Sequence, residues 1–158
     1  MAFSWEPFGR IRSEEPASEP APAETPSEPV PQPRGGLARE PRRRLAVLTC
    51  MDCRIDPLRA LGLRLGDAVV LRNAGAQASD DVLRSLRMAH KTLGVQAVAV
   101  IGHTDCAAHG GDDAVAVAAA RQAAMRIAGA LPLRAESALL DLASGELSRR
   151  DGARPPSG

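Results

Sequence analysis

Apolar runs separated by amphipathic stretches begin near residue 45 of this chain. Uninterrupted runs of strand-type residues without a charge predict buried strands at Leu45–Thr49 and Ala97–Ile101. Two further strands are predicted, one at Asp67–Arg72 and a short one near Ala138–Leu142. Gly102 is expected to provide the turn that ends the strand at Ala97–Ile101. The pattern therefore predicts four strands.

Helical signals lie between these strands. Asp56-Pro57 is a helix start, because proline suits the first helical position, and Gly62 is a stop. Ser79 is expected to cap a second helix that ends at Gly94. The apolar positions of that helix share one face: Val82, Leu86, Ala89 and Leu93. A third, alanine-rich helix is predicted at Asp113–Ala130. The alternation predicts an α/β fold, a small, mostly parallel sheet flanked by helices, with right-handed crossovers.

Composition divides the chain into three parts. Nine of its thirteen prolines fall within residues 7–41, and residues 14–33 hold five glutamates and no Lys or Arg. Such a segment buries too little apolar surface to offset its ordering entropy, so residues 1–40 are predicted to form a disordered, Pro/Glu-rich arm. Residues 41–150 form the predicted α/β domain, and residues 151–158 a loose tail.

Charge and targeting signals limit the partners. A net charge of +1 argues against a nucleic-acid partner, and Arg42-Arg43-Arg44 is interpreted as a solvated cluster before the first strand. With no secretory leader and no apolar run of transmembrane length, no membrane partner is expected. Three cysteines in such a chain indicate a reducing cytoplasm.

A partner subunit is expected, because a domain of about 105 residues buries a smaller fraction of its surface than a larger one. A homodimer or larger homo-oligomer is therefore predicted. The three aromatic residues, Phe3, Trp5 and Phe8, lie in the first eight residues. They either dock on a neighbouring subunit or belong to a frayed terminus.

Two cysteines and a histidine follow the carboxyl ends of two predicted strands. Cys50 comes directly after the first strand, and His103 and Cys106 follow the third. In open α/β sheets, ligands gather outside the carboxyl ends of the strands. Thiolate and imidazole are preferred ligands of zinc, and three protein ligands leave a fourth position for water. The sequence therefore predicts a zinc ion (Zn²⁺) held by Cys50, His103 and Cys106.

Other interpretations of these residues stay open. Each could be an ordinary buried side chain, and Cys53 could complete a closed Cys₃His structural site or a redox C-x-x-C pair with Cys50. Asp52 and Arg54 favour the open, catalytic site, because a structural zinc knuckle has no need of them.

A carboxylate beside the zinc has a specific use. Zinc lowers the pKa of bound water and supplies hydroxide near neutral pH. Two thiolates cancel its formal charge, so a group that orients the hydroxide matters more. Asp52 is the candidate, with Arg54 holding it by charge-assisted hydrogen bonds. The alternative is an ordinary surface pair, worth less than about 1 kcal/mol.

Three ordered motifs carry a family resemblance: C-x-D-x-R at residues 50–54, R-N-A-G at 72–75 and H-T-D-C at 103–106. They resemble the β-class carbonic anhydrases, in particular the compact bacterial branch, over roughly residues 45–148. The resemblance implies the fold, the zinc site and the Asp52–Arg54 dyad, and implies that Asp52 can become a fourth zinc ligand in a resting form. Cys53, Ala107 and a shortened segment after Cys106 depart from the family pattern.

The predicted function is reversible, zinc-dependent hydration of carbon dioxide to bicarbonate and a proton, by zinc-bound hydroxide assisted by the dyad. Alternatives are a non-hydratase zinc-binding module on the same scaffold, or hydrolysis of a small carbon–sulfur substrate such as carbon disulfide.

Further residues around the site are assigned lesser roles. Arg72, Asn73 and Gly75 are expected to shape the loop that walls the site. His109 is interpreted as a solvated loop histidine or a proton relay, and His90 as structural.

Overall fold

The computed structural model describes residues 36–149. Its strands and α-helices, in chain order, are β1 (Leu45–Cys50), α1 (Pro57–Ala60), β2 (Ala68–Asn73), α2 (Asp80–Leu93), β3 (Ala97–His103), α3 (Asp113–Ala130), β4 (Arg134–Leu140) and β5 (Leu147–Arg149). Two short 3₁₀ helices, η2 (Ala74–Ala76) and η3 (Ala107–His109), follow β2 and β3. None of the described helices is long and apolar enough to cross a membrane.

The strands form one sheet in the order β2-β1-β3-β4-β5, in which the first four are parallel and β5 is antiparallel. Cys50 at the end of β1 pairs in register with Asn73 at the end of β2. On the other side of β1, Thr49 pairs with Ile101, so β3 continues two residues further to His103. The register thus brings the loops after β1, β2 and β3 together at one edge. The predicted α/β class and mostly parallel sheet are confirmed.

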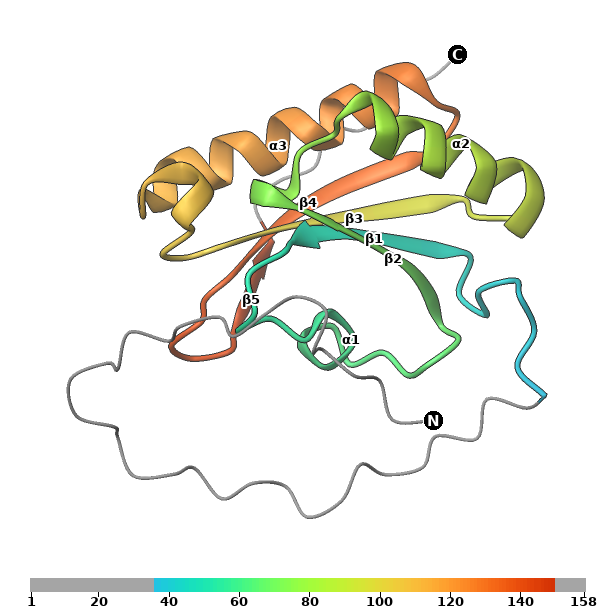
Figure 1. Ribbon diagram of the computed structural model, residues 1–158, viewed down its shortest axis with the longest axis horizontal. Helices are drawn as coiled ribbons and strands as arrows, with labels where there is room; N and C mark the ends of the chain where they lie inside the picture. The colour runs from blue at the N-terminus through green and yellow to red at the C-terminus, as the bar shows by residue number, and fades with distance from the viewer. Residues whose placement is uncertain (1–35, 150–158) are drawn as a thin grey trace, which may run out of the picture. The chain divides into compact units, whose positions relative to one another are not determined.

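Helices α2 and α3 cover one face of this sheet, whereas the one-turn helix α1 is the only described α-helix on the other (Figure 1). The larger core lies under α2 and α3, and its fully buried members include Leu48, Leu86 and Ile127. The smaller core, around Val47 and Ile101 on the α1 side, contains Cys50 and Cys106. The two thiols are therefore built into the packing of the domain, which fixes their positions.

The caps of α2 agree with the prediction. The hydroxyl of Ser79 accepts a hydrogen bond from the Val82 backbone N–H, and Gly94 ends the helix in the left-handed conformation that suits glycine. The predicted strand near Ala138–Leu142 was placed too late, since β4 begins at Arg134. Its first residues alternate between exposed and buried, so they lack the continuous apolar run on which the prediction relied.

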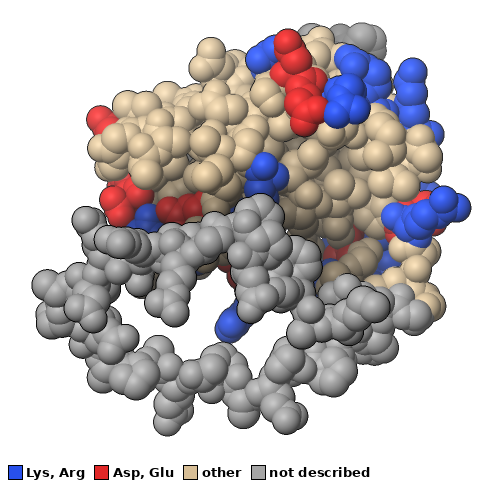
Figure 2. All heavy atoms as spheres, viewed as in Figure 1, with Lys and Arg blue, Asp and Glu red and all other residues tan. Residues whose placement is uncertain are grey.

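Charged side chains gather on the outer surface over α2, at the upper right of Figure 2. Helix α2 itself carries the exposed pair Arg84–Asp81, with 2.6 Å between nitrogen and oxygen. The predicted disordered arm, residues 1–40, lies outside the described residues except for 36–40, and the predicted loose tail, 151–158, lies wholly outside them. Both stay predictions.

Candidate metal centre

Cys50, His103 and Cys106 meet at the carboxyl edge of the sheet. One potential ligand atom from each lies within 4.8 Å of the other two, and all three residues are buried. The two sulfur atoms are 4.0 Å apart. Strands β1 and β3 are neighbours, so the register alone brings the two ligand-bearing loops together. The structure therefore forms the group of three that the sequence predicted.

The hydrogen bonding of His103 leaves its Nε2 atom available to a metal. Its Nδ1 lies 2.9 Å from the Thr104 carbonyl oxygen, which accepts a hydrogen bond only if Nδ1 carries the proton. That tautomer leaves a lone pair on Nε2. Among the described residues, His103 Nε2 is the single buried side-chain nitrogen or oxygen without a hydrogen-bond partner. An unpartnered buried nitrogen beside two thiols fits a soft divalent cation such as zinc.

The thiols point to the same conclusion. Burial raises the pKa of the Cys106 thiol, and the neighbouring Cys50 raises it further. A cation favours the thiolate and would reverse this effect. Cys50 also has a weak polar contact, because the Gly75 backbone N–H donates to its Sγ at 3.3 Å. The donor set therefore fits zinc.

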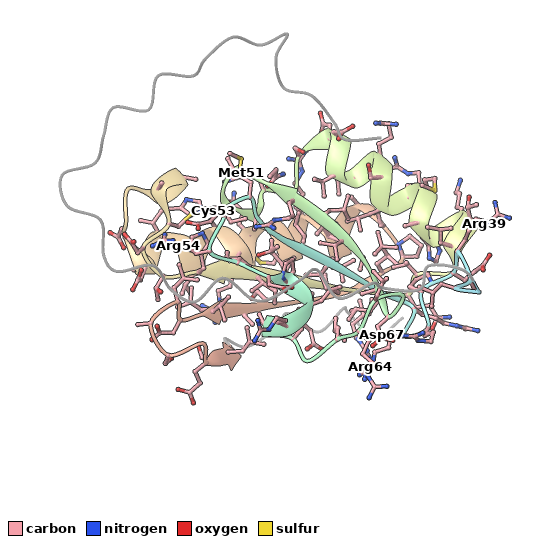
Figure 3. All side chains as sticks on the ribbon, turned by 60° about the horizontal axis from the view of Figure 1, so that its bottom comes forward. Arg39, Met51, Cys53, Arg54, Arg64 and Asp67 are labelled. Carbon is pink, nitrogen blue, oxygen red and sulfur yellow. The ribbon has the colours of Figure 1, made fainter. Side chains whose placement is uncertain are left out.

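Cys53 lies apart from this group. It is exposed, and it is not among the three residues whose ligand atoms converge in the described part of the chain. Figure 3 shows Cys53 beside Met51 and Arg54 on the loop after β1. This placement gives no support to the closed Cys₃His alternative.

Asp52 and Arg54 form a close ion pair on that loop. Arg54 Nη2 donates to Asp52 Oδ2 at 2.7 Å, and Nε donates to Oδ1 at 3.0 Å. The backbone N–H of Arg54 adds a third hydrogen bond, to Oδ1 at 2.9 Å. The Arg54 hydrogen bonds hold the pKa of Asp52 well below its usual range, and Asp52 in turn raises the pKa of Arg54. Asp52 is therefore a carboxylate at any neutral pH.

Asp105 is a contact of Arg54 that the sequence analysis did not find. Arg54 Nη1 donates to Asp105 Oδ2 at 2.9 Å, and Nη2 donates to the Asp105 carbonyl oxygen at 3.1 Å. The two residues are 51 positions apart. The only available signal was the position of Asp105 between His103 and Cys106, in the loop that the sheet brings next to Cys50.

Arg72 holds the loop that carries Cys50. Its Nε donates to the Cys50 carbonyl oxygen at 2.9 Å, and its Nη2 donates to the Asp52 carbonyl oxygen at 2.7 Å. Asn73 closes the next turn by two side-chain hydrogen bonds with the Gln77 backbone. Both residues thus shape the wall of the site through backbone contacts, the role expected of them.

Gly75 lies between Cys50 and His109. Its φ is +72°, and a Cβ atom there would lie 2.7 Å from His109 Nε2. His109 Nε2 is 3.3 Å from the Gly75 carbonyl oxygen, so the ring packs on this loop. His90 lies elsewhere, with Nδ1 2.7 Å from the Val95 carbonyl oxygen beyond the end of α2, which suits a structural role.

Comparisons with known proteins agree with this fold and site. A family model described as carbonic anhydrase matches residues 45–143. β-Carbonic anhydrase 1 of Mycobacterium tuberculosis is 42% identical over 73 residues, which is 46% of this chain and 45% of the relative. A carbon disulfide hydrolase of Saccharolobus solfataricus is 47% identical over 64 residues, covering 40% of this chain and 31% of the relative. The alignments thus span less than half of these relatives' length.

Solved structures give the same result. The carbonic anhydrase of Streptococcus mutans superposes with a TM-score of 0.60 at 29% identity, covering 71% of this chain and 84% of that one. A carbonic anhydrase from Glaciozyma antarctica has a TM-score of 0.59 at 28% identity, with 75% and 88% covered. The fold and the Cys-His-Cys group are those of a β-class carbonic anhydrase scaffold. The chain belongs to the carbonic anhydrase family.

Proposed function

We propose that this chain is a zinc enzyme that hydrates carbon dioxide reversibly to bicarbonate and a proton. The observation that carries the proposal is the adjacency of two units. One is the buried group of Cys50, His103 and Cys106 with its unpartnered His103 Nε2. The other is an ionised carboxylate, Asp52, on the loop that begins at Cys50. A structural site needs only the first unit, whereas water activation at a zinc with two thiolate ligands also gains from the second.

Cys50 Sγ, Cys106 Sγ and His103 Nε2 would hold the ion. When bound, zinc lowers the pKa of a coordinated water and so supplies hydroxide near neutral pH. The remaining roles belong to the chain. Burial of the three ligands excludes competing water, and the Thr104 carbonyl fixes the tautomer of His103.

Asp52 would orient the reacting water. Its Oδ2 accepts one described hydrogen bond, from Arg54, and retains a lone pair for a water proton. The low pKa of Asp52 makes it a weak base, so it accepts a hydrogen bond and does not store the proton. Release from Arg54 would let Asp52 become a fourth ligand in a resting form, and Arg54 therefore keeps the carboxylate available.

Carbon disulfide is the second candidate substrate. The specific observation in its favour is the 47% identity to the carbon disulfide hydrolase of Saccharolobus solfataricus over 64 residues. Both reactions add water to a linear, electrophilic carbon, so the same metal and the same carboxylate would serve either. A non-hydratase zinc module remains the outcome if neither substrate reacts.

We also propose that the chain works as a homodimer or larger homo-oligomer. Large apolar side chains are exposed beside the site and on the edge strand: Met51 is 67% exposed and Val70 of β2 is 37% exposed. A second copy would cover such positions. Analytical ultracentrifugation of the full chain would check this, and a monomer at micromolar concentration would contradict it.

The direct experiment is stopped-flow hydration of carbon dioxide by protein of measured zinc content, with carbon disulfide hydrolysis assayed on the same sample. Cys50→Ala provides the metal-free control. Hydration that scales with bound zinc supports the proposal. Carbon disulfide turnover without hydration transfers the assignment to the second substrate, and the absence of both leaves the non-hydratase module.

A further inference from the structure

Arg54 is held from two sides by two different loops. Asp52 occupies the Nε and Nη2 side of the guanidinium, with contacts of 3.0 and 2.7 Å. Asp105 occupies the Nη1 side at 2.9 Å, and its carbonyl oxygen accepts a further bond from Nη2 at 3.1 Å. Each of the three guanidinium nitrogens therefore has an acceptor. The two carboxylates use different sides of the fork, so they bind Arg54 at the same time.

Asp105 is itself fixed in place. Its backbone N–H donates to Asp113 Oδ1, at the start of α3, at 2.9 Å. Its φ of +53° lies in the left-handed region, which aspartate tolerates better than most side chains. The loop that holds Asp105 runs between two metal-ligand candidates, His103 and Cys106. Arg54 thus connects the loop after β1 to the loop after β3 across the site.

We propose that Asp105 is a positioning residue for the Asp52–Arg54 dyad: it anchors Arg54, so that Arg54 keeps Asp52 paired and away from the metal. This inference rests on the dyad of the proposed function. The contacts with Asp52 alone leave the guanidinium open to solvent, because Arg54 is 48% exposed and exposed ion pairs gain little from their attraction. A second anchor, fixed by its backbone, restricts the conformations of the Arg54 side chain. The ion pair with Asp52 then costs less side-chain conformational entropy.

The opposite effect is also physically possible. Asp105 could compete for the positive charge of Arg54 and so weaken its hold on Asp52. The use of separate sides of the guanidinium argues for anchoring, because neither carboxylate displaces the other. The two mechanisms predict opposite changes when Asp105 is removed, which makes the proposal testable.

The test uses the cobalt-loaded full chain, whose visible absorption reports the ligands of the metal without any turnover. Arg54→Ala frees Asp52 and defines the spectrum of a site with an added carboxylate ligand. Asp105→Gly removes the carboxylate that anchors Nη1 without straining the left-handed backbone, and should shift the spectrum most of the way towards that of Arg54→Ala. Asp105→Asn keeps an acceptor for Nη1 and should restore part of the wild-type spectrum.

Asp81→Asn is the matched control. Asp81 has the same side-chain exposure as Asp105, 74%, and also pairs with an arginine, but it lies on α2. Its replacement should leave the cobalt spectrum unchanged. Adding Asp105→Gly to Arg54→Ala should produce no further shift, because Asp105 acts through Arg54. A thermal transition for every variant shows that it has folded.

Three results would overturn the proposal. In the first, Asp105→Gly leaves the spectrum as in the wild type while Arg54→Ala shifts it. In the second, Asp105→Gly shifts the spectrum away from that of Arg54→Ala, as competition predicts. In the third, its effect persists in the Arg54→Ala background. If the spectra change as predicted but no hydration is detected, the carbon dioxide activity is refuted and the role of Asp105 is not. Failure of the proposed function and failure of this inference are therefore distinguishable.

Discussion

Each end of the sheet has an aspartate–arginine ion pair, but the surroundings of the two pairs differ. At the carboxyl ends of the strands, Asp52 pairs with Arg54, and at the amino ends, Asp67 pairs with Arg42 (Figure 3 labels Arg54, Arg64 and Asp67). Both carboxylates have a lowered pKa, and hydrogen bonds are the main cause in each case. The ion pair by itself therefore does not distinguish a functional site from a structural one.

The surroundings of each pair distinguish the functional site from the structural one. Asp67 Oδ1 accepts from Arg42 Nε at 2.8 Å, and Oδ2 accepts from the Arg64 backbone N–H at 2.9 Å. Backbone bonds run in parallel, from Arg42 to the Gly66 carbonyl and from Arg43 to the Asp67 carbonyl. This end fastens the segment before β1 to the turn before β2. At the other end, Asp52 lies two residues after Cys50, which belongs to the group with two thiols and an unpartnered buried imidazole nitrogen, and this position makes it a candidate for chemistry.

Loss of a metal ligand at the carboxyl end of the sheet should have the largest effect. Cys50→Ala removes one of three ligands, so stoichiometric zinc should be lost, as measured by elemental analysis after gel filtration. Cys53→Ser, on the same loop but outside the ligand group, should keep one zinc per chain. Full occupancy in Cys50→Ala, or the loss of a thiolate ligand in the cobalt spectrum of Cys53→Ser, would show that the ligands are misassigned.

An added methyl group should destabilise the fold more at Gly75, at the carboxyl edge of the sheet, than at a glycine in open space. Gly75→Ala combines a left-handed backbone with a Cβ 2.7 Å from His109 Nε2, and should cost about 2–4 kcal/mol of unfolding free energy. Gly94→Ala is the matched control, because Gly94 has a φ of +70° and no atom within 4 Å of the added carbon. It should cost only about 1 kcal/mol. Equal urea midpoints for the two variants would refute the close approach at Gly75.

The response to acid should show the smallest difference, because both pairs obey the same linkage. A carboxylate whose folded pKa lies below its ordinary value of 3.8 stabilises the fold above that pH, and this stabilisation is lost as the pH falls through 3.8 and below. In metal-free protein, Asp67→Asn and Asp52→Asn should each flatten the fall in urea midpoint between about pH 5 and pH 3. An unchanged slope in Asp67→Asn would contradict its lowered pKa.

Most of the fold could be predicted because local signals agree with tertiary packing. The apolar runs of β1 and β3, the Ser79 cap and Gly94 each have one favourable structural solution. The start of β4 was missed, since Arg134 and Glu136 point outward and break the apolar run. The three residues of β5 are too few to show any period.

The site divides in the same way. Cys50, His103 and Cys106 could be brought together from the sequence, because parallel neighbouring strands align their carboxyl ends. The contact between Arg54 and Asp105 could not, since it joins two irregular loops through long side chains. Neither loop has a periodicity that specifies where its side chains point.

The central claim is that Asp52 does chemistry and Asp67 does not, and the hydration rate tests it most directly. Asp52→Asn and Asp67→Asn, each with zinc quantified and a cooperative thermal transition, should be compared by stopped-flow carbon dioxide hydration. Asp52→Asn should lose about 10²–10⁴-fold, the range found for side chains positioned on a reacting proton. Asp67→Asn should remain close to the wild type. An unchanged rate in Asp52→Asn at full zinc occupancy, or an equal loss in both variants, would contradict the account.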